Sequence, residues 1–211
     1  MVHVIDWQNR DRFTDAIEQI HRLRKQVFID FFKWDLTHVN GLEYDQFDTP
    51  DAFYLFDQDP ETGTVLSSMR LLPTTGPHMM DSLFSHMCAV EWPRGPNVLE
   101  VSRLLYNPIL QGADEETMLR TRRRFALGLL EFCELWGIRE LVFVTHAKFL
   151  ARLVNYNWDI RPLGLPTIDG SQQAAAMRLI LTPETLPNLR TQFNHFEPVL
   201  QSHPARPRKA A

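Results

Sequence analysis

The stretch Val98-Leu99-Glu100-Val101-Ser102-Arg103-Leu104-Leu105-Tyr106 carries the clearest fold signal in this chain of 211 residues. Its apolar side chains, which end at Asn107-Pro108, predict a β-strand buried in a sheet. Glu100 and Arg103 place two charges inside this strand. Burying a charge is costly unless it is paired and hydrogen-bonded. The stretch therefore predicts both a sheet and a charged site on it.

The same combination recurs elsewhere in the first half of the chain. Arg70 lies within Ser67-Ser68-Met69-Arg70-Leu71-Leu72, which also indicates a strand. Three cations and three carboxylates stand out in this way, interleaved with the aromatic residues Phe28 and Trp34: Arg24, Asp45, Asp48, Arg70, Glu100 and Arg103. We expect these charges to pair with one another or to bind a charged substrate. The residues alone leave both explanations open.

Hydrophobic periodicity predicts helices and strands that alternate along the chain. Helices are predicted over residues 11–32, 114–136, 147–156 and 183–196. Strands are predicted over residues 2–4, 52–57, 64–72, 98–106, 140–145, 159–163 and 176–181, and a loop over residues 34–50. This order predicts an α/β (α+β) three-layer sandwich around one mixed, twisted sheet. We expect a single domain over residues 1–200 and a disordered basic tail over residues 201–211.

Composition is typical of a soluble globular protein, with 44% hydrophobic and 23% charged residues. No apolar run approaches the roughly 18 residues that span a bilayer. The first residues show no secretory signal, and the two cysteines, Cys88 and Cys133, lie far apart. Free thiols are typical of a reducing compartment, so a cytoplasmic location is expected.

Charge is distributed unevenly along the chain. Residues 1–60 hold 12 acidic and 6 basic residues, whereas residues 61–211 hold 14 acidic and 16 basic residues. An acidic first part suits a cationic ligand, and a basic remainder suits phosphates or an acidic partner. Ordinary surface variation would give the same pattern.

Each candidate residue also has a plainer explanation. Asp45 and Asp48 are typical of a solvated loop, although paired carboxylates also clamp a cation or an arginine. Trp34 fits a core position as well as a pocket wall. Glu100 is a candidate general base or a structural partner of Arg103. The eight histidines show no ligand spacing, so no metal site is predicted, and the common hydrolase and nucleotide-loop motifs do not occur.

The order and spacing of these residues resemble those of the acyl-homoserine-lactone synthases of the LuxI type, the autoinducer synthases of bacterial quorum sensing. The resemblance runs from about residue 3 to about residue 190. One part of it is the continuous block Arg70-Leu-Leu-Pro-Thr-Thr-Gly-Pro-His78-Met79. The other parts are the spaced residues Arg24-x-x-x-Phe28, Trp34, Asp45-x-x-Asp48 and Glu100-Val-Ser-Arg103.

The resemblance implies a fold like that of the GCN5-related N-acetyltransferases. It also implies an enzyme that transfers an acyl group from a carrier thioester to the amine of S-adenosylmethionine, closes the lactone and releases methylthioadenosine. The implied catalytic residues are Glu100, Ser102 and Arg103, with backbone N–H groups near them stabilising the oxyanion. The implied S-adenosylmethionine pocket consists of Arg24, Phe28, Trp34, Asp45, Asp48 and Arg70. No cofactor is implied, because S-adenosylmethionine is a substrate, and neither nucleic acid nor a membrane is expected as a partner.

The acyl end of the implied enzyme is less well defined. The resemblance places the acyl pocket at Met79, Phe143 and Thr145, and the phenyl ring favours an unsubstituted, short, branched or aryl acyl group. The donor would be an acyl carrier protein or an acyl-coenzyme A, docked by Arg120, Arg123, Arg124, Lys148 and Arg152. A solvated charged surface explains the same basic residues. Two rival functions remain, an N-acyltransferase of the same fold that acts on another amine and a non-catalytic sensor of S-adenosylmethionine or of an acyl carrier.

Overall fold

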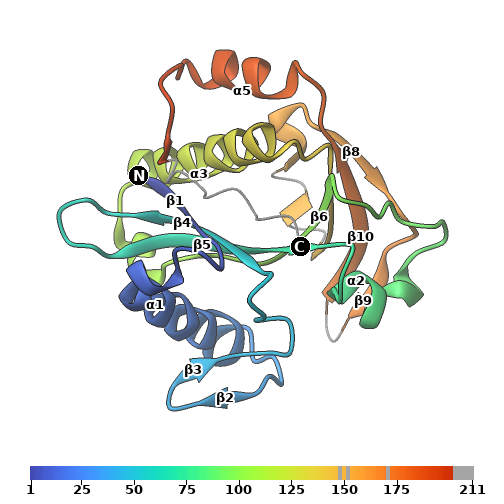
Figure 1. Cartoon of the computed structure of the whole chain (residues 1–211), viewed down its shortest axis with the longest axis horizontal. Helices are drawn as coiled ribbons and strands as arrows, with labels where there is room; N and C mark the ends of the chain where they lie inside the picture. Colours follow the sequence, from blue (N-terminus) through green and yellow to red (C-terminus); the bar gives the residue numbers. More distant parts are fainter. Residues whose placement is uncertain (147–148, 151–152, 170–171, 202–211) are drawn as a thin grey trace. The chain divides into compact units, whose positions relative to one another are not determined.

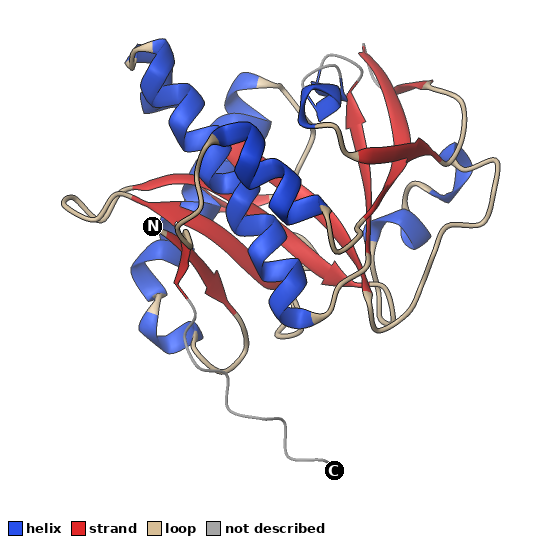
Figure 2. Ribbon diagram, turned by 90° about the horizontal axis from the view of Figure 1, so that it is seen from above, coloured by secondary structure: helices blue, strands red, loops and turns tan. Residues whose placement is uncertain are grey.

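The computed structural model describes residues 1–146, 149–150, 153–169 and 172–201. Figure 2 shows its strands in red and its helices in blue. Two compact units make up the chain. The first contains residues 1–70, 103–128 and, in the described part, 198–201, and the second contains residues 71–102 and 129–197. Three elements contribute residues to both units: β5 (Val65–Pro73), β6 (Val98–Tyr106) and α3 (Glu115–Trp136).

The first unit contains a mixed sheet. Its strands follow the order β11 (Leu200–Gln201), β1 (Val2–Ile5), β4 (Phe53–Gln58), β5 and β6. Strand β1 runs parallel to β11 and antiparallel to β4. In the β1–β4 register, Val2 lies opposite Asp57 and Ile5 lies opposite Tyr54. Because side chains alternate along a strand, the Val2 pair and the Ile5 pair point to opposite faces of the sheet.

Helices cover both faces of this sheet. Helix α3 packs on the Val2 face, where a Cβ atom added at Gly128 would lie 2.7 Å from a Val2 methyl group and Arg124 bonds Asp57 at 2.6 Å. Helix α1 (Thr14–Arg24) packs on the other face, with the His21 ring 5.8 Å from the Tyr54 ring. Figure 1 shows the two helices on opposite sides of the strands. The predicted helix–sheet–helix layering is present in this unit.

The region after α1 differs from the sequence prediction. A π-helix (Lys25–Phe31) follows α1 directly, and the N–H of Phe32 bonds the carbonyl of Val27 at 3.0 Å. The predicted helix over residues 11–32 is therefore three segments, the 3-10 helix η1 (Arg10–Arg12), α1 and the wider π turn. Residues 34–50 were predicted as a loop, but they contain the hairpin β2 (His38–Val39) and β3 (Leu42–Glu43). Asn40 and Gly41 both have positive φ, as a two-residue hairpin turn requires.

The second unit is built on β6, β7 (Glu140–His146), β10 (Gln172–Ile180) and β8 (Asp159–Pro162), in that order. Strand β7 is parallel to β6 and antiparallel to β10, and β9 (Thr167–Asp169) pairs with β10. The helical elements in the described part of this unit include α2 (Met79–Ser82), η3 (Ser85–Met87), η5 (Val154–Tyr156) and α5 (Thr185–Phe193). The remaining 3-10 helix, η4 (Pro108–Gly112), belongs to the first unit.

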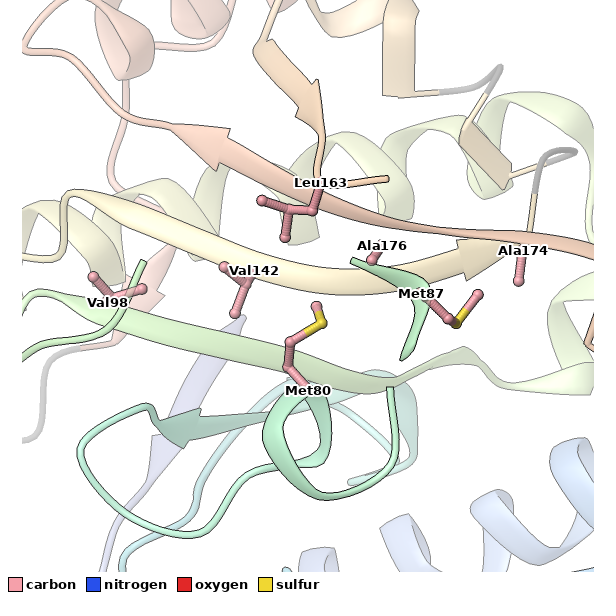
Figure 3. Close-up of a cluster of buried hydrophobic side chains, with 7 residues drawn as sticks. All are labelled: Met80, Met87, Val98, Val142, Leu163, Ala174 and Ala176. Atoms are coloured by element: carbon pink, nitrogen blue, oxygen red, sulfur yellow. The ribbon is translucent and has the colours of Figure 1, made fainter. Parts of the chain in front are cut away.

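A buried apolar cluster, here named the Met80 cluster, forms part of the core of the second unit (Figure 3). The methionine side chains come from α2 and η3 and point toward alanine and valine side chains of the strands. Its members are Met80, Met87, Val98, Val142, Leu163, Ala174 and Ala176. Methionine is flexible and polarisable, so it fills irregular space between small side chains.

The longest predicted elements are confirmed, and the short ones are not all foreseen. The predicted strand over residues 98–106 coincides with β6, and the predicted helix over residues 114–136 begins one residue later in α3. Strands β9 and β11 and helix α2 were not predicted. Parts of the predicted helix over residues 147–156, and the tail from residue 202, lie outside the described residues. In the described part of the chain, no helix combines the length and apolarity that crossing a membrane requires.

Candidate functional site

Six charged side chains of the first unit form one connected group, here named the charge cluster: Arg24, Glu43, Asp45, Asp48, Arg70 and Arg103. The three arginines come from the end of α1, from β5 and from β6. Glu43 ends β3, and the two aspartates follow in the next loop. Five members were predicted from the sequence, and the structure brings these five together.

Local geometry explains why the two aspartates share one place. The N–H of Asp45 bonds a carboxylate oxygen of Asp48 at 2.8 Å, and the N–H of Phe47 bonds the carboxylate of Asp45 at 2.9 Å. Such side-chain bonds to nearby N–H groups fix a tight turn. The loop itself therefore fixes both carboxylates, in addition to their bonds to arginine.

Each carboxylate of the charge cluster bonds more than one arginine. Glu43 accepts a bond from Nε of Arg24 and another from Arg103 at 2.9 Å. Asp48 accepts bonds from Arg24 at 2.7 Å and 3.0 Å and one from Arg70 at 2.7 Å. Asp45 lies 2.5 Å from Arg70 and 2.8 Å from Arg103. Three positive and three negative charges thus balance, and the group is paired within itself.

Burial and pairing act in opposite directions on the proton affinities of this group. Burial alone would raise the pKa of Asp48, but its bonds to Arg24 and the charges of Arg24 and Arg70 outweigh burial and lower it. The pKa of Asp45 is lowered in the same way, chiefly by Arg70 against the effect of burial. Burial opposes the positive charge of Arg24, yet the bonds to Asp48 and Glu43 raise its pKa. Arg24, Asp45 and Asp48 therefore stay ionised at neutral pH.

Exposure within the charge cluster is concentrated at one member. The side chain of Asp45 is 18% exposed, whereas those of Arg24, Arg70 and Glu43 are at most 1% exposed. A network in which most members are buried and paired holds its neighbours in place. Most of the cluster is thus structural, and the part that solvent reaches, at Asp45, is where a ligand can bind.

Aromatic rings lie beside this cluster. The guanidinium of Arg103 is 5.6 Å from the centre of the Phe28 ring, and the Trp34 ring stacks on Phe28 at 5.0 Å. Phe28 is buried and belongs to the π-helix, while Trp34 is half-buried. A wide helical turn of this kind is frequently found at functional sites. The arrangement presents a flat aromatic surface next to fixed charges, which suits a planar or cationic ligand.

Three residues of this site were missed by the sequence reasoning. Glu43 bridges two arginines, His21 lies 2.7 Å from the carbonyl oxygen of Glu43, and Tyr54 donates a bond of 2.6 Å to Asp48. Burial, and then the charge of Asp48, raises the pKa of Tyr54. The available signal was the hairpin turn Asn40-Gly41, which places Glu43 in a strand and not in a solvated loop.

Arg103 has an unusual backbone. Its φ is +53°, although it lies inside β6. A left-handed residue inside a strand is typical of a β-bulge, which redirects a side chain. For a residue other than glycine, such a conformation costs on the order of 1–3 kcal/mol and is concentrated at active sites.

Glu100 belongs to the second unit and is 1% exposed. Its Oε2 accepts a hydrogen bond of 2.6 Å from the N–H of Met79, the first residue of α2. In the β6–β7 register, Glu100 lies beside Val142. Neighbouring strand positions point to the same face, so Glu100 shares a face with the Met80 cluster, to which Val142 belongs. A buried carboxylate next to an apolar surface suits a general base.

The other catalytic and acyl candidates occupy distinct positions. Ser102 lies two residues after Glu100 on β6 and is half-buried. Phe143 and Thr145 alternate along β7 with Val142 and Val144, so they point to the face opposite the Met80 cluster. Met79 is buried and donates the bond to Glu100.

The basic residues proposed to dock a partner differ in their surroundings. Arg124 bonds the buried carboxylate of Asp57, which gives it a structural role. Arg120 is exposed and bonds Thr117 at 3.2 Å, and Arg123 is half-buried. Lys148 and Arg152 lie outside the described residues. Within the described residues, no group of three His, Cys, Asp or Glu side chains is arranged to hold a metal ion.

Comparison with known proteins supports the resemblance found in the sequence. The profile of the family described as autoinducer synthase matches residues 8–188. Isovaleryl-homoserine lactone synthase of Bradyrhizobium diazoefficiens is 31% identical over 212 residues, which cover 97% of this chain and 90% of that protein.

Solved structures agree as well. The structure of a CoA-dependent acyl-homoserine lactone synthase, BjaI, with SAM and isopentyl-CoA is similar with a TM-score of 0.88 at 27% identity, covering 98% of this chain and 94% of that one. An acyl-CoA N-acyltransferase from Pseudomonas aeruginosa, at 17% identity, has a TM-score of 0.54 and covers 84% of this chain and 97% of that one. The second likeness concerns the fold alone, and it confirms the N-acetyltransferase-like fold expected from the sequence.

Proposed function

The chain belongs to the autoinducer synthase family, and we propose that it takes its acyl group from an acyl-coenzyme A thioester. It is an acyl-homoserine-lactone synthase, an enzyme of the acyltransferase class whose product is a quorum-sensing autoinducer. The single observation that carries the proposed chemistry is the paired charge cluster with its aromatic neighbours, which can bind a sulfonium substrate. The proposed reaction requires no protein nucleophile.

The proposed reaction forms two bonds to S-adenosylmethionine. In the first step the amine nitrogen attacks the thioester carbonyl carbon, an amide bond forms, and the carbon–sulfur bond of the thioester breaks. The proton lost by the amine leaves with the coenzyme A thiol. In the second step a carboxylate oxygen attacks the carbon beside the sulfonium, which closes the lactone and releases neutral methylthioadenosine. Positioning the reacting atoms supplies much of the acceleration in reactions of this kind.

The charge cluster is proposed to hold the S-adenosylmethionine pocket in shape. Three of its members are both buried and paired, and they keep the neighbouring loop rigid: Arg24, Asp48 and Arg70. Phe28 and Trp34 contact the substrate, because a stacked aromatic surface attracts a sulfonium cation and an adenine ring. Asp45, the most exposed carboxylate of the cluster, lies where it can attract the positive end of the substrate.

Glu100 is proposed as the base that takes a proton from the amine, directly or through a water molecule. The N–H of Met79 donates a hydrogen bond to one oxygen of this carboxylate and so orients the carboxylate. Backbone N–H groups of residues 101–103 are proposed to stabilise the oxyanion, with Ser102 and Arg103 beside them. The left-handed backbone of Arg103 supports this proposal, because such a residue departs from the extended backbone that regular strand pairing requires.

The acyl group is proposed to be short and branched and to pack on the Met80 cluster. Two observations support this assignment. Glu100 shares a face with the cluster, and a similar enzyme makes isovaleryl-homoserine lactone. The alternative contacts suggested by the sequence, Phe143 and Thr145, lie on the other face of β7. Substitutions on the two faces therefore separate the two routes for the acyl chain.

Coenzyme A is proposed as the donor because BjaI, with a TM-score of 0.88 to this chain, is CoA-dependent. Arg120 and Arg123 are proposed to bind the phosphates of the donor, whereas Arg124 is held by Asp57. Lys148 and Arg152 stay docking candidates on the sequence alone. We propose a cytoplasmic location, supported by the free cysteines, and a reaction that needs no cofactor.

A product assay tests this function. Purified protein is incubated with S-adenosylmethionine and a panel of acyl-coenzyme A and acyl-carrier-protein thioesters, and products are separated and weighed by mass spectrometry. We expect acyl-homoserine lactone and methylthioadenosine, with a branched short-chain coenzyme A thioester as the best donor. Turnover with the carrier-protein thioesters alone would reject the proposed donor, and the absence of lactone from every mixture would reject the proposed function.

A further inference from the structure

The candidate base, Glu100 of β6, is hydrogen-bonded by a residue from another segment, the start of α2. Glu100 is almost completely buried, and its Oε2 lies 2.6 Å from the N–H of Met79. Met79 is the first residue of α2, and its N–H donates to the carboxylate. The orientation of the Glu100 carboxylate therefore depends on where the backbone of residue 79 lies.

His78 fixes that backbone. It is 1% exposed, and its Nδ1 lies 2.8 Å from the carbonyl oxygen of Gly76. A carbonyl oxygen only accepts, so Nδ1 carries the proton and a neutral ring has its lone pair on Nε2. Nε2 is buried, and among the described residues it has no hydrogen-bond partner. The one polar bond of the ring within the described structure thus closes the turn that leads into Met79.

The other end of the same loop is tied to β6. The N–H of Gly76 bonds the carbonyl of Pro73 at 3.3 Å, and the hydroxyl of Thr74 bonds the carbonyl of Val98 at 2.9 Å. Val98 precedes Glu100 by two residues on that strand. The loop over residues 73–79 is therefore hydrogen-bonded to β6 at two places, through Thr74 near its start and through Met79 at its end. The side chain of His78 bonds the backbone of the last turn between these two places.

We propose that His78 is a positioning residue for Glu100, which it orients through the Gly76–Met79 turn and the N–H of Met79. The proposal rests on the proposed function, since it takes Glu100 as the base. An N–H bond to a carboxylate favours its charged form and fixes its direction. Without the hydrogen bond of His78 to Gly76, the Glu100 carboxylate is less well aligned with the amine, so turnover falls.

Two substitutions separate the two ring nitrogens. The amide of His78→Asn places a donor near the position of Nδ1, whereas the amide of His78→Gln reaches the position of Nε2. We expect His78→Asn to keep the pH profile of kcat/KM and to hold kcat within about threefold of the original protein. We expect His78→Gln to lower kcat about tenfold and to leave KM for S-adenosylmethionine unchanged. A general base contributes roughly 100-fold or more to the rate, and this variant misaligns the base without removing it. Equal behaviour of the two variants would overturn the proposal.

A double-mutant cycle tests whether His78 acts through Glu100. In a Glu100→Gln background the base is already absent, so adding His78→Gln should reduce the residual rate no further. A reduction as large as in the original protein would show a role independent of Glu100 and would overturn the proposal. If the original protein forms no lactone, the proposed function has failed. If it forms lactone and His78→Gln behaves normally, only the positioning role has failed.

A measurement on the unaltered chain keeps the proposal falsifiable even where a variant does not fold. Nitrogen NMR of histidine-labelled protein distinguishes a ring protonated on Nδ1 from one protonated on Nε2. We expect the His78 ring to be protonated on Nδ1 near neutral pH. A proton on Nε2 alone would exclude the bond to Gly76 and, with it, the proposed positioning role.

Discussion

The charge cluster and the Met80 cluster are built from opposite kinds of side chain. The charge cluster fixes its geometry with hydrogen-bonded ion pairs, in which each arginine bonds at least two carboxylates. The Met80 cluster has no charge and combines flexible methionines with small alanines. Directional bonds allow few alternatives, whereas apolar packing tolerates changes of shape at similar volume. The difference suggests that the first region sets the reaction and the second sets the acyl group.

The largest expected effect concerns the stability supplied by the charge cluster. Arg70→Met leaves Asp45 and Asp48 with one cation fewer in a buried position. Breaking a buried pair by removing one partner costs on the order of 3–5 kcal/mol. We expect the free energy of unfolding, measured with urea, to fall by that amount.

Arg161→Met is the matched control for this substitution. Arg161 also pairs with an aspartate, Asp159, but both side chains are about half exposed at 54% and 44%. An exposed pair is screened by water and contributes little to stability, so little change is expected. Equal losses in the two variants would remove the distinction between a structural cluster and an ordinary surface pair.

The second expected effect is a pH dependence of the free energy of unfolding that arises from His21, beside the charge cluster. Burial, and then the charge of Arg24, lowers the pKa of His21 from 6.5 to about 4. A lowered pKa means that the neutral ring stabilises the folded chain above pH 6.5, and that this contribution is lost as the pH falls toward 4. Over the first 1.5 pH units below 6.5, about 2 kcal/mol should be lost.

His21→Asn checks this expectation. It keeps a donor for the carbonyl of Glu43 but does not titrate. Urea unfolding measured at several pH values should give a flatter curve for this variant than for the original chain. Identical slopes would show that His21 is not the group responsible. Asp45 and Asp48, whose pKa values are lowered, should add a further loss of stability below about pH 4 in both proteins.

A further effect should appear at the Met80 cluster, in the choice of acyl group. Ala176→Leu adds bulk on the face that carries Glu100, while Phe143→Leu alters the opposite face of β7. We expect Ala176→Leu to lower kcat/KM for a branched five-carbon thioester about tenfold relative to a two-carbon one, since one methylene changes such ratios by at least that factor. Phe143→Leu should leave the ratio unchanged. The reverse result would move the acyl chain to the face that the sequence first suggested.

The sequence predicted those site residues whose charges interrupt a periodic apolar strand. Arg70 and Arg103 were conspicuous because they interrupt apolar strands, and the structure places both arginines in the charge cluster. Glu43 escaped notice because it is one acidic residue among several in a stretch without clear period. Its bridging role depends on a hairpin of two-residue strands, which leaves almost no periodic signal.

For the apolar region, the face on which each candidate residue lies could not be predicted, for a different physical reason. The identity of a strand residue does not reveal its face unless the register is known, because a shift of one residue reverses every side chain. The register of β7 with β6 places Val142 beside Glu100. Phe143, the next residue on β7, therefore points to the other face. The bond from Met79 to Glu100 also depends on a helix of four residues, too short to show a pattern.

The most direct test of the account is the stoichiometry of product formation from S-adenosylmethionine and isovaleryl-coenzyme A. Mass spectrometry should detect isovaleryl-homoserine lactone and methylthioadenosine in equal amounts over time, with both greatly reduced in Glu100→Gln. Equal amounts are required if acyl transfer and ring closure occur on the same molecule. Methylthioadenosine without lactone, or neither product with any acyl thioester, would contradict the account.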